Sequence, residues 1–522
     1  MSLVKNFVTV GGATLSSRLL GFVRDVFMAN MLGSGPIADA FFVAFRLPNL
    51  FRRLFAEGAF SSAFVPLFGR ALHEGGKVSA RALAEDILAV FLLALVVVTA
   101  LAEVGAPWLV GILAPGFVAD PDKFAAAEFM TRVMFPYLAC MSLTAMAAGM
   151  LQSFGRFAVA AFAPSLLNVI LVAALVLIWW QNWAGTPEAA YTLSWAVFIS
   201  GIVQLIAVGG SLWWIGFPMS FTRPRYNGNV RRFVTLGIPG VISGGITQIN
   251  IVVGTIIASM QASAVSWLYF ADRIYQLPLG VIGVAIGVVL LPDLTRRVRG
   301  DSLDSIFHTQ NRALEFAMAL TLPATVALCA IPYTIMRVLF ERGAFTAADT
   351  VATADALIAF AAGLPAFVAI KVFQPSFYAR EDTRTPTIQG GISVAVNIVA
   401  SIALFPFIGH VGIAAATSLA AWVNAIMLVI ELIRRGHFKA DALLLRRLTL
   451  LAVASLMMGA ALLGGESLID AHLTGGRQLA QGLWLLLLCL WGMAVYGLAT
   501  VLTGAVDVRR YLKAVLARGR SG

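Results

Sequence analysis

The chain has 522 residues, of which 60% are hydrophobic and only 12% are charged, and its formal net charge is +11. Soluble domains carry about 45–50% apolar and about 25% charged residues, so this composition excludes an ordinary soluble protein and indicates helices that face lipid. The positive charge would suggest nucleic acid in a soluble protein, whereas in a membrane protein its position relative to the bilayer decides its meaning.

A spanning helix needs about 20 mostly apolar residues, and the chain contains about fourteen segments of this kind. Charged residues interrupt the first, second and eighth segments, so hydropathy alone would score them poorly. The charges of Arg18, Arg24 and Asp25 also argue against a cleavable signal peptide at the start. We therefore predict an all-α polytopic membrane protein. The approximate spans are 7–32, 37–68, 84–112, 124–153, 158–181, 189–216, 230–260, 264–295, 312–340, 352–378, 385–407, 411–434, 444–466 and 479–505.

Lysine and arginine are distributed unevenly between alternate connecting segments. With the N-terminus in the cytoplasm, most of the 37 lysines and arginines fall in cytoplasmic segments, and the external loops hold only Lys123, Arg342 and Arg477. Bacterial inner-membrane proteins show this bias. It predicts a multi-pass protein with both termini in the cytoplasm, whose basic charge faces anionic membrane lipids and does not require nucleic acid.

A weak internal repeat relates the two halves of the chain. Pro164 and Asn168 in the fifth segment correspond to Pro386 and Asn397 in the eleventh. Two six-helix lobes related by a parallel pseudo-two-fold axis would explain the repeat, as in several transporter folds, although helical hairpins can also look alike by chance. The predicted parts are residues 1–222 as the N-terminal lobe, 223–438 as the C-terminal lobe, and 439–522 as two extra helices with a basic cytoplasmic tail.

Charged side chains within the spans are costly, about 2.5–3.5 kcal/mol each on insertion scales, and usually face a partner or a wet cavity. On a helical wheel, Arg18, Arg24 and Asp25 share one polar arc of about 120° in the first segment. The other intramembrane polar residues are Asp39, Arg46, Asn49, Arg52, Arg53 and Glu57 in the second segment, and Asp272, Arg273 and Gln276 in the eighth.

Arginines outnumber carboxylates in these three segments, which favours an anionic ligand. We interpret Arg18, Arg24, Arg52 and Arg273 as substrate-binding residues of a central cavity, because a guanidinium group matches two phosphate oxygens at once. Internal ion pairing is the alternative, and Arg46 and Arg53 fit it better. The pairs would be Asp25 with Arg24 or Arg18, Arg46 with Asp39 or Glu57, and Arg273 with Asp272.

The sequence lacks a recognisable enzymatic constellation. It has no Ser-His-Asp order, no glycine-rich phosphate loop followed by Lys, and no metal-ligand spacing among its histidines and cysteines. We therefore expect a non-enzymatic transporter with no cofactor, no metal and no bound nucleotide. An ion gradient, the membrane potential or the substrate gradient would supply its energy.

Several motifs resemble those of the MurJ (MviN) lipid II flippases, and the likeness runs from the first segment to the fourteenth. The longest is the second-segment motif, which is also the most specific. The matching stretches are residues 17–25, 38–60, 114–117, 162–168 and 269–273.

The resemblance implies a MOP-superfamily fold with two lobes, two extra helices that form a groove for the undecaprenyl tail, and alternating access around a cationic cavity. It maps the essential arginines of the family onto Arg18, Arg24, Arg52 and Arg273. A Glu frequent in the family is replaced here by Gln276, which weakens any coupling role for an acid at that position. The supporting residues are Asp25, Asp39, Arg53, Asp272 and Gln276.

The resemblance also implies the cargo and the partners. The substrate would be lipid II, the undecaprenyl-pyrophosphate-linked peptidoglycan precursor, and membrane lipids and the cell-wall synthesis machinery would be partners. A related exporter of another lipid-linked oligosaccharide or of a small molecule is the alternative. A membrane-embedded glycosyltransferase or a non-transporting scaffold fits less well, because the external loops are short and the spans are rich in arginine.

Overall fold

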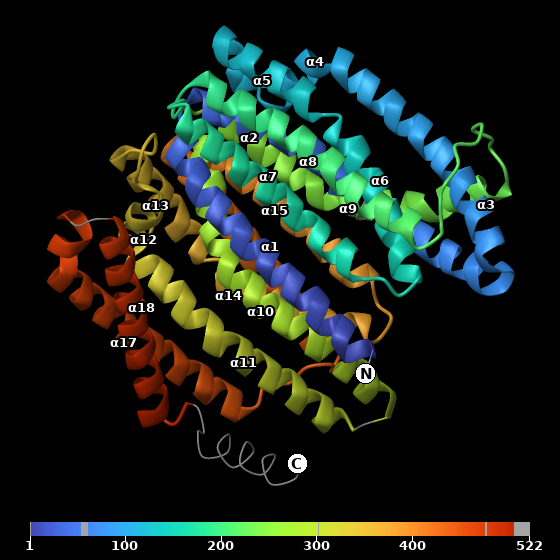
Figure 1. Ribbon diagram of the computed structural model, residues 1–522. Helices are drawn as coiled ribbons and strands as arrows, with labels where there is room; N and C mark the ends of the chain where they lie inside the picture. Colours follow the sequence, from blue (N-terminus) through green and yellow to red (C-terminus); the bar gives the residue numbers. More distant parts are fainter. Residues whose placement is uncertain (1, 54–60, 301, 476–477, 506–522) are drawn as a thin grey trace. The chain divides into compact units, whose positions relative to one another are not determined.

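The computed structural model describes residues 2–53, 61–300, 302–475 and 478–505, and every regular element among them is a helix (Figure 1). The elements are α1 Ser2–Leu32, α2 Pro36–Arg52, α3 Ser61–Val104, α4 Ala106–Leu113, the 3-10 helix η2 Pro115–Ala119, α5 Pro121–Met134, α6 Tyr137–Ser153, α7 Ala158–Trp180, α8 Pro187–Trp214, α9 Gly228–Ser259, α10 Ala264–Gly300, α11 Leu303–Ala330, α12 Pro332–Phe340, α13 Ala347–Ala361, α14 Leu364–Tyr378, α15 Arg384–Ile408, α16 His410–Arg434, α17 Ala442–Gly475 and α18 Gln478–Leu502. The predicted all-α class is confirmed.

Ten helical stretches among the described residues are long and apolar enough to cross a membrane. Helices α1, α2 and α10, which carry the intramembrane charges, are not among them, as the sequence led us to expect. The exact number of fourteen crossings stays a prediction. The predicted second span continues through residues 54–60, which lie outside the described residues, into α3, where Gly76 has a φ of 66° and separates two helical parts.

The chain divides into two compact units. Unit 1 comprises Met1–Ser266 together with Arg342–Thr346, and unit 2 comprises Trp267–Glu341 and Ala347–Gly522. Helix α10 therefore starts in unit 1 and continues in unit 2. The lobe boundaries at residues 222 and 438 stay a prediction.

Close helix packing in unit 1 depends on small residues. Helix α7 lies between α1 and α8, and α6 also lies against α8. A Cβ atom added at Gly201 of α8 would lie 2.8 Å from the Tyr137 ring, so only glycine permits this approach. A buried cluster centred on Phe64, Phe68 and Met146 joins α3 to α6.

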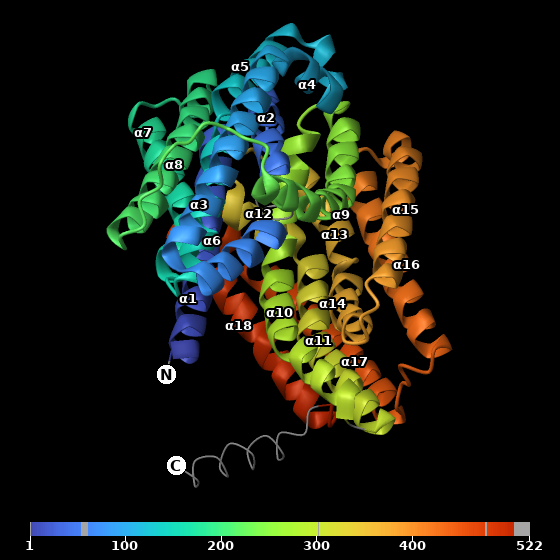
Figure 2. The same ribbon diagram turned by 90° about the vertical axis from the view of Figure 1, so that its right-hand side faces the viewer.

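In unit 2, α15 and α16 lie side by side, as do α17 and α18 (Figures 1 and 2). A Cβ atom added at Gly363 would collide with Ser418 of α16. Helix α17 lies along α11, and the Tyr496 hydroxyl of α18 donates to the Ala319 carbonyl at 2.6 Å. The two extra helices predicted after residue 439 are thus joined to unit 2 through α11.

Candidate functional site

A buried polar cluster joins α1 to α7 in unit 1. The Arg24 side chain is 8% exposed, and its Nε and Nη2 atoms donate to Asp25 Oδ1 at 3.0 and 2.6 Å. Arg24 Nη1 donates to Asn168 Oδ1 of α7 at 2.9 Å. Of the two partners proposed for Asp25, the structure therefore selects Arg24, and Arg24 stands beside an acid before any substrate binds.

Arg18 occupies a different environment from Arg24, although both belong to the predicted polar arc of α1. Its side chain is exposed, whereas Arg24 is buried against α7. The two residues stand at opposite edges of that arc, so one helix presents one accessible and one enclosed guanidinium group.

Arg52 lies at the end of α2 and is half-buried. Its Nε donates to Asn49 Oδ1 at 3.4 Å, and Asn49 in turn donates to the Phe45 carbonyl at 2.8 Å, so the last turns of α2 carry a local polar chain.

The other charged residues of the predicted second span differ in their surroundings. Arg46 donates to the Thr255 hydroxyl of α9, and Arg53 is exposed. Glu57 lies outside the described residues.

Asp39 has a partner that the sequence analysis did not consider. Its carboxylate is fully buried and accepts from Lys123 Nζ at 2.8 Å, so the suggested pairing of Asp39 with Arg46 is wrong. The same carboxylate accepts from the Ser263 and Ser266 amides at 2.9 and 3.0 Å and from the Ser266 hydroxyl at 2.7 Å. Asp39 thus fixes the start of α10 against α2 and α5.

Lys123 is also buried, although it belongs to a connection that the charge bias placed outside. Its ammonium lies 4.0 Å from the centre of the Phe117 ring in η2. A buried lysine requires compensation of its charge, and here both a carboxylate and an aromatic face supply it.

Arg273, Asp272 and Gln276 lie on α10 in unit 2. The Arg273 guanidinium lies 4.7 Å from the centre of the Tyr269 ring. The Gln276 amide donates to the Asp272 carboxylate one turn earlier. Glutamine at this position therefore stabilises Asp272, whereas a second carboxylate would repel it. Three of the four predicted substrate-binding arginines belong to unit 1 and Arg273 to unit 2.

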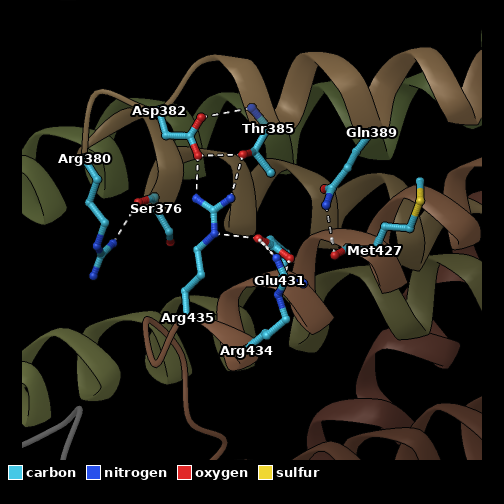
Figure 3. A network of polar contacts seen from close by, with 9 residues as sticks. All are labelled: Ser376, Arg380, Asp382, Thr385, Gln389, Met427, Glu431, Arg434 and Arg435. Atoms are coloured by element: carbon cyan, nitrogen blue, oxygen red, sulfur yellow. Dashed lines mark hydrogen bonds and ion pairs between the residues drawn. The ribbon is translucent and has the colours of Figure 1, made fainter.

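A second polar network joins α14, α15 and α16 of unit 2 at the end predicted to face the cytoplasm (Figure 3). Asp382 accepts from the Thr385 amide at 2.9 Å, from the Thr385 hydroxyl at 2.7 Å and from Arg435 at 2.7 Å. Arg435 also pairs with Glu431 at 2.5 Å. The two bonds from Thr385, followed by the contact with Arg435, lower the pKa of Asp382 to about 2.

The contacts of Asn168 and Lys123 emerge only from the structure. Asn168 was noted only as part of a motif, although a lone amide in a strongly apolar helix is itself a signal that a partner is present. Lys123 gave no such signal, because it lies in a predicted external loop, where a charged side chain needs no buried partner.

Solved structures show which class of protein has this fold. A lipid II flippase MurJ in an inward-closed conformation matches with a TM-score of 0.79 and 25% identity, covering 95% of this chain and 98% of that one. An inward-facing multidrug resistance MATE transporter of the MOP superfamily matches with a TM-score of 0.66 and 15% identity over 80% and 94% of the two chains, which shows the fold alone. These matches show that the protein has the fold of these multi-pass membrane transporters.

Sequence comparisons identify the family within that class. The family model described as lipid II flippase MurJ matches residues 28–481. A probable lipid II flippase MurJ of Rhizobium meliloti is 51% identical over 88% of this chain and 86% of its own length, and one of Rhizobium tropici is 46% identical over 98% and 97%. The lipid II flippase MurJ of Burkholderia cenocepacia is 34% identical over 88% and 89%. The chain belongs to the lipid II flippase MurJ family.

Proposed function

We propose that this protein translocates lipid II from the cytoplasmic to the periplasmic leaflet of the bacterial inner membrane during cell-wall synthesis. Family membership over most of the chain is the observation that carries the proposal. The arginines on α1, α2 and α10 supply the chemistry, because guanidinium groups bind the oxygens of a pyrophosphate in pairs.

The transport cycle follows from charge and alternating access. The pyrophosphate and sugars of lipid II enter a cytoplasm-facing cavity, where Arg18, Arg24, Arg52 and Arg273 neutralise the phosphate charge and favour inward closure. The isoprenoid tail remains in lipid, next to α17 and α18. Net transport requires that the outward state binds lipid II less tightly than the inward state does.

The same proposal places both termini in the cytoplasm and requires no cofactor, metal, nucleotide or enzymatic step. Asp25, Asp39, Arg53, Asp272 and Gln276 act as supporting residues. Lipid II and membrane lipids are the expected partners, together with enzymes of cell-wall synthesis.

Replacement of the native flippase in a bacterium tests the function. Cells that depend on this protein should survive and display lipid II at the outer leaflet, and Arg18→Ala or Arg273→Ala should abolish both without loss of membrane insertion. Arg132→Ala is the matched control, because Arg132 pairs with Glu128 at 2.7 Å on the exposed side of α5. A fully active, normally expressed Arg18→Ala protein would refute the assignment of this arginine.

The similarity in fold to a MATE transporter supports one alternative function, which the same experiment tests. An exporter of another lipid-linked oligosaccharide or of a small molecule would insert stably without exporting lipid II. Purified protein in liposomes separates this outcome from incompatibility with the host.

A further inference from the structure

The carboxamide of Asn168 forms hydrogen bonds to α1 through both its oxygen and its nitrogen atom. Its Oδ1 atom accepts from Arg24 Nη1 at 2.9 Å, and its Nδ2 atom donates to the Ser17 carbonyl at 2.9 Å. Asn168 itself is 5% exposed. One buried side chain of α7 therefore holds both the backbone of α1 and the guanidinium group of Arg24.

The sequence of α1 provides the space for this contact. Ser17, Gly21 and Arg24 are spaced four and three residues apart, so they lie on one face of the helix. A Cβ atom added at Gly21 would lie 3.6 Å from Asn168 Nδ2, in ordinary van der Waals contact. Alanine would also fit beside the carboxamide, so the contact requires only a small residue at position 21.

The chemistry of asparagine suits a group that must orient an arginine without neutralising it. An amide oxygen accepts a hydrogen bond as a carboxylate does but carries no charge. Asp25 already supplies one negative charge to Arg24. An acid at position 168 would place a second negative charge beside Arg24 and would oppose the binding of a phosphate there.

We propose that Asn168 is a positioning residue that fixes the orientation of the Arg24 guanidinium group for recognition of the substrate pyrophosphate. The inference rests on the proposed function, because it assumes that Arg24 binds phosphate. Asn168 acts through Arg24, and a hydrogen bond to a charged group is strong enough to hold a guanidinium group in one orientation.

The chain offers a matched control in the corresponding residue of the predicted repeat. Asn397 of α15 is also 5% exposed, but its Nδ2 atom donates to the Thr417 hydroxyl at 3.2 Å and its Oδ1 atom accepts from Ser401 at 3.0 Å. Asn397→Leu therefore removes an equally buried amide that has no hydrogen bond to Arg24.

The first measurement needs no lipid substrate. The full-length protein in detergent is treated with phenylglyoxal, and modification of Arg24 is quantified by mass spectrometry, with exposed Arg18 as the internal reference. Asn168→Leu should raise the modification rate of Arg24 severalfold, while Asn397→Leu should leave it unchanged. Equal rates in the wild type and Asn168→Leu would overturn the proposal, as would an equal rise in both leucine variants.

The second measurement uses purified lipid II as the probe. Loss of one hydrogen bond to a charged group predicts about a tenfold or greater rise in Kd for Asn168→Leu. In an Arg24→Lys background, Asn168→Leu should raise the Kd for lipid II little further. An equally large rise in Kd in both backgrounds would contradict a role of Asn168 through Arg24.

Asn168→Asp keeps the experiment decisive if the leucine variant does not fold. The carboxylate retains an acceptor for Arg24, so phenylglyoxal modification should stay low while lipid II binding falls about tenfold or more. If Asn168 served only to join α7 to α1, Asn168→Asp should instead increase the modification of Arg24, because aspartate cannot donate to the Ser17 carbonyl. A wild-type protein that does not bind lipid II would refute the proposed function, and the phenylglyoxal results would still decide whether Asn168 positions Arg24.

Discussion

The ammonium of Lys123 lies 2.8 Å from the carboxylate of Asp39, and this buried ion pair joins two helices of unit 1 through side chains 84 positions apart. Ser263 and Ser266 donate to the same carboxylate, so the pair also holds the start of α10, the helix that carries Arg273. The buried pair therefore fixes the first residues of α10 within unit 1.

Lys123→Met should destabilise the protein, because it leaves the Asp39 carboxylate buried without its counter-ion. Breaking a buried pair in this way costs about 3–5 kcal/mol. Unfolding in mixed detergent and SDS micelles measures the change, with Lys77→Met as a control at an exposed lysine. The combined variant Asp39→Asn/Lys123→Met should be more stable than Lys123→Met alone, and a Lys123→Met protein of wild-type stability would show that the pair contributes nothing.

Gly33→Ala should detach the segment Arg342–Thr346 from the end of α1. Gly33 has a φ of 65°, and an added Cβ atom would collide with the Ala344 carbonyl. A residue other than glycine in such a conformation costs about 1–3 kcal/mol before the collision is counted. The same unfolding assay measures the loss, and Gly390→Ala in the open interior of α15 should cost nothing. Equal stability of the two variants would contradict the close contact between Gly33 and Ala344.

Asp382 should contribute to stability in a pH-dependent way. Its folded pKa of about 2 lies below the unfolded value of about 3.9, so the ionised carboxylate favours the folded state. The contribution is complete above about pH 4 and is lost as the pH falls towards 2. The midpoint of thermal unfolding, measured from pH 2.5 to 6, should be lower for Asp382→Asn than for the wild type at pH 6, with the two curves converging at acid pH. A gap that stays constant with pH would exclude this titration.

The helical class and the charged helices could be predicted from the sequence, because length, hydropathy and charge bias are local properties of a span. The ion pair of Arg24 with Asp25 could also be predicted, because the two residues are neighbours in the sequence. The partners of Asp39 and Asn168 were not, because α2 meets α5 and α1 meets α7 only after folding.

Some helix breaks within the predicted spans are not visible in the hydropathy of the sequence. The predicted ninth span is divided between α11 and α12, and the fourth between α5 and α6, because local backbone conformation depends on neighbours that hydropathy does not describe. One of the two ion-pair predictions for these acids is confirmed and the other is wrong. Asp25 pairs with the adjacent Arg24, whereas Asp39 pairs with Lys123, which lies in a connection predicted to be external.

Translocation of lipid II by the purified protein in liposomes tests whether the protein is a lipid II flippase. Fluorescent lipid II becomes accessible to an external enzyme or quencher only when it crosses the bilayer. We expect protein-dependent translocation that Arg18→Ala and Arg273→Ala abolish and that Arg132→Ala preserves. Wild-type protein that moves no more lipid II than empty liposomes would refute the proposed function. Variants Arg18→Ala and Arg273→Ala that move lipid II at the wild-type rate would refute the role of these arginines.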